Sequence, residues 1–137
     1  MGSLGFEIFW SKYMIYKVDD YVNEYVKLCS QLCRKEEDYT KENILLHNKA
    51  MKRLNKLKEK MYLDSQITSD VYDKLLCSND PYIKQDAATE CLSLRIHLDA
   101  SLAILKEIIK SGERMSAMTA KRTLLIWEGK LDPNLPF

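Results

Sequence analysis

Glycine and proline are scarce in this chain of 137 residues, which has four Gly and three Pro. Sandwiches and barrels need frequent turns, and these two residue types supply most of them. The scarcity therefore argues against an all-β fold and favours helices. No apolar run approaches the ~20 residues that a membrane-spanning helix needs. The first residues also lack the basic start of a secretory signal. We therefore expect a cytoplasmic protein that contacts no membrane.

Sequence motifs of enzyme active sites are also missing. The chain has no Gly-rich phosphate loop, paired-histidine zinc motif, nucleophile elbow or Cys-His signature. Its two histidines, His47 and His97, lack the spacing of paired metal ligands. Cys29 and Cys33 are four residues apart, but a zinc site would need two further ligands. We predict no enzyme activity, no cofactor and no metal, with all four cysteines reduced and packed as small hydrophobic residues.

The chain does show helical periodicity along almost its whole length. Apolar residues make up 46% and charged residues 30%, a mixture typical of globular domains. Apolar side chains recur at steps of three and four residues, as on one face of a helix. The predicted helices cover residues 18–33, 41–61, 65–77, 81–98, 100–111 and 117–128. We predict a single all-α domain of about six helices. Residues 17–131 form the helical array, and residues 1–16 precede it as a strand, a helical turn or an arm.

Polar residues and glycines stand where these helices should begin and end. Asp80 can accept a hydrogen bond from the first turn of its helix, and Pro81 suits the first position because its missing N–H costs nothing there. Ser or Thr stands near the start of the helix at 65–77. The other predicted caps are Thr40, Asp99 and Ser116, and the predicted stops in left-handed conformation are Gly112 and Gly129.

The second, fourth and sixth predicted helices carry apolar residues in the same order. A small residue comes first and larger apolar residues follow one and two turns later. The aligned positions are Ala50, Ala87 and Ala120, then Leu54, Cys91 and Leu124, then Leu57, Leu94 and Trp127. Spacings of about 33 to 37 residues are in or near the range of helix-pair repeats. The pattern fits a helical repeat in which the small residues let two helices approach closely. Any amphipathic helix also carries apolar residues at steps of four and seven, so unrelated helices are the alternative.

The stretch around Asp80 resembles a HEAT-type repeat, in which a helix opens with Asp-Pro and packs through paired alanines. Residues 18–131 resemble more closely a family of small HEAT-like bacterial proteins catalogued as a domain of unknown function. The chain departs from the repeat pattern at Lys84 and Gln85, where Arg and an apolar residue are more usual. Besides an acidic first helix, the matching residues are Asn48, Lys49, Asn79, Asp80, Pro81, Ala87, Ala88, Ala103, Leu105, Ala120, Leu124, Trp127 and Gly129. The resemblance implies an α–α superhelix.

Charge is distributed unevenly along the chain, although the net charge is only +1. Residues 64–99 hold seven acidic and three basic residues, a net charge of −4. The candidate partner-binding residues in this region are Asp70, Asp73, Tyr82, Asp86 and Glu90. The predicted helix 41–61 carries a basic face instead, made by Lys49, Lys52, Arg53, Lys56 and Lys60. Tyr39 and Trp10 are further candidate interface anchors, because aromatic residues dominate binding hot spots.

These features predict a protein-binding module that is not an enzyme. HEAT-like arrays present surfaces that bind macromolecules. We expect a free monomer whose partner is another protein. The most concrete form is an immunity or antitoxin protein that neutralises a cognate bacterial toxin, such as a nuclease whose basic cleft suits an acidic surface. The first alternative is nucleic-acid binding through the basic face, which the net charge of +1 disfavours. The second is a small enzyme, for which His47, expected on an apolar helix face, and His97 offer little.

Overall fold

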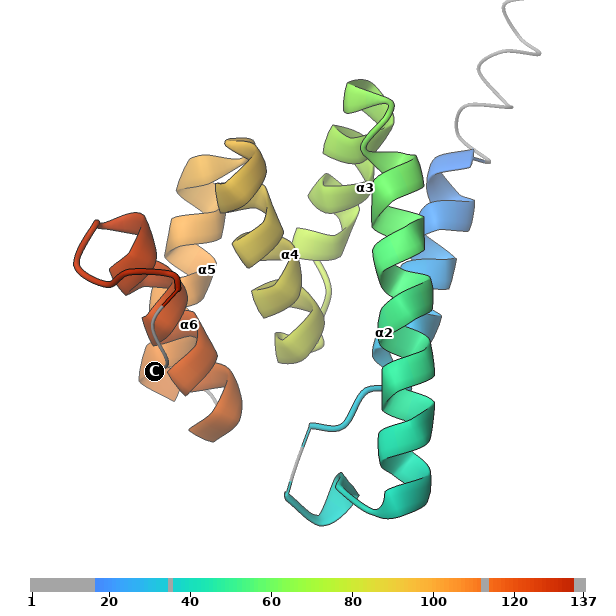
Figure 1. Cartoon of the computed structure of the whole chain (residues 1–137). Coiled ribbons are helices and arrows are strands. Elements are labelled where there is room, and N and C mark those ends of the chain that lie inside the picture. Colours follow the sequence, from blue (N-terminus) through green and yellow to red (C-terminus); the bar gives the residue numbers. More distant parts are fainter. Residues whose placement is uncertain (1–16, 35, 112–113, 135–137) are drawn as a thin grey trace, which may run out of the picture. The chain divides into compact units, whose positions relative to one another are not determined.

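Helices are the regular elements of this protein in its computed structural model, which describes residues 17–34, 36–111 and 114–134. A first helix covers residues 17–29. It is followed by η1 (Glu36–Asp38), α2 (Lys41–Met61), α3 (Ser65–Leu76), α4 (Pro81–Leu94), α5 (Leu98–Ser111) and α6 (Arg114–Trp127) (Figure 1). The predicted all-α class is confirmed. Residues 1–16 and the predicted stop at Gly112 lie outside the described residues.

The chain divides within α3, between Val71 and Tyr72, into two compact units. The first unit holds the first helix, η1, α2 and the start of α3. The second holds the rest of α3 with α4, α5 and α6. A single domain and a superhelical arrangement remain predictions.

In the first unit, the first helix runs alongside α2 in the opposite direction (Figure 1). Both the first helix and the segment after it contact α2. Nζ of Lys58 lies 5.4 Å from the centre of the buried Tyr25 ring. The backbone N–H of Cys33 donates to Nδ1 of His47 over 2.9 Å. The apolar core of this unit includes Val18, Tyr21, Tyr25, Leu28, Cys29, Ala50, Leu54, Met61, Ile67 and Val71.

The first helix ends four residues earlier than predicted, at residue 29 rather than at Cys33. The backbone tightens there, because Gln31 N–H bonds to Leu28 O over 3.1 Å and Leu32 N–H bonds to Cys29 O over 3.2 Å. The Ser30 hydroxyl also donates to Lys27 O, which offers that carbonyl a partner outside the helical ladder. This turn frees Cys33 to bond with α2.

The capping prediction is confirmed for α2 and corrected for α3. Oγ1 of Thr40 accepts from Asn43 N–H over 3.2 Å and starts α2. Asp64, rather than a Ser or Thr, starts α3, since its Oδ1 accepts from the backbone N–H of both Gln66 and Ile67. The hydroxyl of Thr68 is buried and donates to Met61 O over 2.8 Å, so it serves the junction with α2.

In the second unit, α4, α5 and α6 pack against one another (Figure 1). Asp80 caps α4 as predicted, with its Oδ1 accepting from Tyr82 N–H over 3.0 Å, and Pro81 takes the first helical position. The buried apolar residues of this unit are Tyr72, Leu75, Leu76, Ile83, Ala87, Ala88, Cys91, Leu92, Leu105, Ile108, Ala120 and Leu124.

The turn between α4 and α5 was predicted wrongly. Helix α4 ends at Leu94 rather than at residue 98, because Arg95 adopts a left-handed conformation with φ of 57°. Ile96 N–H then bonds to Cys91 O over 3.0 Å, the pattern of a helix closed by a left-handed residue. Helix α5 consequently begins at Leu98, and Asp99 lies in its first turn instead of capping it. No glycine or asparagine in the sequence marks this turn.

The C-terminal end of α6 was predicted correctly, but its N-terminal end was not. Helix α6 begins at Arg114, so Ser116 lies inside it, where its side chain is buried, and does not cap it. Gly129 follows the helix in left-handed conformation with φ of 74°, as predicted. Lys130 N–H bonds back to Leu125 O over 2.8 Å and closes the end of the helix.

The aligned repeat positions share their degree of burial. Ala50, Ala87 and Ala120 are at most 1% exposed, as close approach of helices requires. The residues one turn later, Leu54, Cys91 and Leu124, are also buried. Those two turns later, Leu57, Leu94 and Trp127, are half-buried. The small residues therefore occupy equivalent core positions in their respective helices.

Candidate functional site

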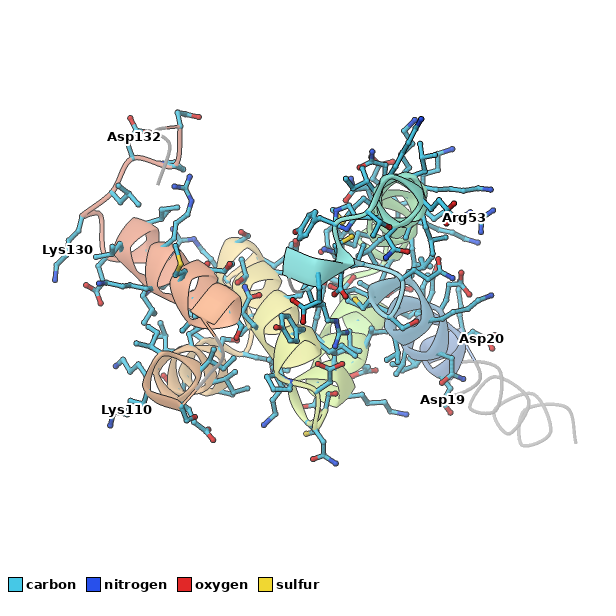
Figure 2. All side chains as sticks on the ribbon, turned by 90° about the horizontal axis from the view of Figure 1, so that it is seen from below. Asp19, Asp20, Arg53, Lys110, Lys130 and Asp132 are labelled. Atoms are coloured by element: carbon cyan, nitrogen blue, oxygen red, sulfur yellow. The ribbon has the colours of Figure 1, made fainter. Side chains whose placement is uncertain are left out.

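The five predicted basic residues, Lys49, Lys52, Arg53, Lys56 and Lys60, are all exposed on α2. Figure 2 shows Arg53 pointing away from the helix. All five are ordinary surface cations, which can attract a phosphate by charge and donate hydrogen bonds to it. One of the five, Lys60, lines a groove together with Asp20 and Glu24, so carboxylates offset part of the positive charge there.

Three of the five candidate partner-binding residues lie on α4, and the other two lie on α3. Tyr82, Asp86 and Glu90 succeed one another every four residues on α4, so they share a face of that helix. All three are half-buried, and each already interacts with another group of the chain. Asp70 and Asp73 are exposed on α3, where Asp70 accepts from Gln66 Nε2 over 3.0 Å. Asp70 belongs to the first unit and the other four residues to the second. Tyr82, Asp86 and Glu90 are therefore the predicted residues that share one helix face.

The two histidines occupy structural positions. His47 is half-buried, and its Nδ1 is occupied by the Cys33 N–H. His97 lies in the turn after α4 with φ of 47°. Within the described ranges, no cluster of three His, Cys, Asp or Glu side chains is arranged to hold a metal ion.

The free cysteines differ more in burial than predicted. Cys29 and Cys91 are buried, but Cys33 is half-buried and Cys77 is exposed, so packing as a hydrophobic residue does not describe Cys77. Burial raises the pKa of the Cys91 thiol to about 11, although interaction with the Ser101 hydroxyl lowers it in part. The Ser101 hydroxyl is itself fully buried, and it has no hydrogen-bond partner of good geometry in the described part of the chain. A thiol held protonated in this way is a poor nucleophile at neutral pH.

Exposed apolar residues gather at the start of α2, and the sequence analysis named only one of them. Tyr39, Ile44, Leu45 and Leu46, hereafter the apolar end of α2, are all exposed, Leu45 by 65%. Tyr39 and Ile44 stand at the two positions of a hydrophobic staple, which gives them a local reason to be apolar. Leu45 and Leu46 have no such reason. The sequence contains a signal for this exposure, because three consecutive apolar residues span about 200° of a helix and cannot all face one core.

Tyr39 is the one predicted interface anchor that is exposed, since Tyr82 is half-buried and Trp10 lies outside the described residues.

Comparison of the chain with protein-family models, curated proteins and solved structures finds no match. In the described part of the chain, no helix combines the length and apolar character needed to cross a bilayer.

Proposed function

We propose that this chain is a non-catalytic protein-binding module, and the apolar end of α2 is the observation that carries the proposal. Surface groups of large apolar residues are typical of protein-protein contact sites. Fully burying one leucine side chain contributes about 1.5 to 3 kcal/mol. Covering Leu45 and Leu46 with a partner would therefore supply a substantial part of a binding free energy, before the costs of association are subtracted.

The most concrete form of this proposal is an immunity or antitoxin protein. Such a protein acts by covering its toxin and needs no chemistry of its own. The aligned Asp86 and Glu90 of α4 supply negative charge that suits a basic active-site cleft, such as that of a nuclease. In this form the chain is a cytoplasmic monomer until it meets the toxin. Charge reversal in D86K/E90K should then slow association with the toxin, because complementary fields speed encounter.

Nucleic-acid binding is the second candidate function, favoured by the five exposed cations of α2. Lysines and arginines that neutralise phosphates release counterions, so binding would weaken steeply with salt. The K52E/R53E/K56E variant should then abolish retention on RNA or DNA resins at low salt. If the wild-type chain is not retained, this candidate is wrong.

The protein-binding proposal is tested by affinity capture from the native host with L45E and a matched control. Leu63 is 88% exposed between α2 and α3 and lies outside the apolar end of α2, so L63E introduces the same change at a site without neighbouring exposed leucines in sequence. The wild type and L63E should each capture the same partner in stoichiometric amount, and L45E should lose it. Circular dichroism checks that both variants are folded. Capture of no stoichiometric partner by the wild type, or equal capture by L45E, would refute the proposal.

A further inference from the structure

A groove between α4 and α6 in the second unit has the size and lining of a binding site. Its volume is about 450 Å³, within the roughly 300 to 1,000 Å³ of small-ligand pockets. Apolar side chains of Leu92, Ile126 and Trp127 line it together with hydroxyl groups from both helices. The hydroxyls of Thr89 and Thr123 lie 3.4 Å apart and join the two helices. The groove therefore combines an apolar lining with neutral hydrogen-bonding groups.

Among the described residues that line this groove, Arg95 alone is charged. Its Cζ lies 5.4 Å from the centre of the Trp127 ring, a distance at which a guanidinium is attracted to an indole. Within the part of the chain that the structure describes, the Arg95 guanidinium has no ion pair and no hydrogen bond. A guanidinium held against an aromatic ring keeps the N–H donors of its edge available for a carboxylate.

Two features hold this arrangement in place. The left-handed conformation at Arg95 closes α4 and directs the chain away from it, at a position where Gly or Asn would be less strained. Across the groove, an Arg122 Nη donates to Pro133 O over 3.1 Å and holds Pro133, another residue of the lining. Because the Arg122 guanidinium is engaged there, Arg95 supplies the cation of the site.

We propose that this groove binds a short segment of a partner protein in which a carboxylate side chain stands beside apolar residues. The carboxylate would pair with the edge of Arg95, and the apolar residues would cover the half-buried side chain of Ile126. Charge complementarity selects this occupant, because the lining residues that the structure describes carry one positive charge and no negative one. A nucleic acid fits less well, since Arg95 already lies over the indole face on which a base would stack and one cation neutralises one phosphate.

The inference extends the protein-binding proposal to a second surface, and its test is independent of the Leu45 experiment. The full-length chain is used to select from a phage-displayed library of random hexapeptides. The wild type should enrich peptides with Glu or Asp next to apolar residues. R95N should not enrich them, although it should fold well because Asn tolerates left-handed backbone better than Arg does. K110N serves as the control, since Lys110 is an exposed cation on α5 that does not line the groove, and it should select as the wild type does.

Binding is then measured through the fluorescence of Trp127 in a W10F background, which leaves one tryptophan. The best selected peptide should shift the emission saturably. Replacing its acid by the amide, or using R95N, should weaken binding by about tenfold or more, the loss expected for a charge-assisted hydrogen bond. The inference is overturned if no acidic peptide is enriched, if R95N binds equally, or if the amide peptide binds as well. An R95-dependent response to oligothymidylate alone, or R95-dependent self-association in sedimentation, would also overturn it.

Discussion

The backbone N–H of Cys33 donates a hydrogen bond to Nδ1 of His47 across 2.9 Å, and this bond ties the segment after the first helix to α2. We predict that H47A lowers the free energy of unfolding by about 1 to 2 kcal/mol, because the N–H loses its acceptor in a part-buried site. H47N should retain most of the stability, since its Oδ1 can take the place of Nδ1. Urea denaturation measures both variants. Equal losses in H47A and H47N would contradict this role of the ring nitrogen.

Asp80 should contribute to stability as the cap of α4. The D80A variant removes the acceptor of the Tyr82 N–H, and we expect a loss of about 1 kcal/mol. D80S should recover most of that loss, because a serine hydroxyl accepts the same bond. D73A removes an exposed aspartate from within α3 and should change stability by no more than about 0.5 kcal/mol. The thermal midpoints of the three variants give the comparison, and a D80A midpoint equal to that of D73A would count against the cap.

The buried repeat alanine of α4 should not tolerate a larger side chain. Ala87 is 0% exposed, so A87L must displace packed neighbours and should cost about 1 to 3 kcal/mol or more. Ala103 is exposed on α5, and A103L should leave the free energy of unfolding within about 0.5 kcal/mol of the wild type. Chemical denaturation of both variants tests the prediction. Similar stabilities would show that Ala87 does not mark a close helix contact.

Cys91 should make the folded state less stable in alkaline solution. Burial raises the pKa of its thiol from 9.0 to about 11, so above pH 9 the unfolded chain loses this proton while the folded chain keeps it. The free energy of unfolding should therefore fall between pH 9 and about 11, by on the order of 2 kcal/mol from this group, whereas below pH 9 its titration has no effect.

The C91A variant isolates this thiol from the lysines and tyrosines that titrate in the same range. Unfolding free energies of the wild type and C91A are compared at pH 8, 9, 10 and 10.5. The wild type should lose more stability than C91A as the pH rises. Parallel curves would refute the buried-thiol explanation, even if C91A is less stable at every pH because of the cavity it leaves.

Local features of the sequence determined the helices and several of their ends. The three-and-four spacing of apolar residues predicts α2 through α6, and Thr40, Asp80 and Gly129 act where they were expected. The repeat alanines were placed correctly in the core for the same reason. Each of these features depends on interactions within one or two helical turns, which a sequence displays directly. The basic face of α2 followed from the same periodicity.

The tertiary structure alone decided which of these surfaces meet. Arg95 and Trp127 line one groove and lie against each other, although they are distant in the sequence, because the packing of α4 against α6 brings them together. The left-handed turn at Arg95 could not be predicted from local preference, since a strained backbone persists only where surrounding packing holds it. The exposure of Leu45 was decided in the same way, because an apolar residue is buried only if another element covers it. The sequence therefore determined the helices, and the contacts between them determined the two candidate binding surfaces.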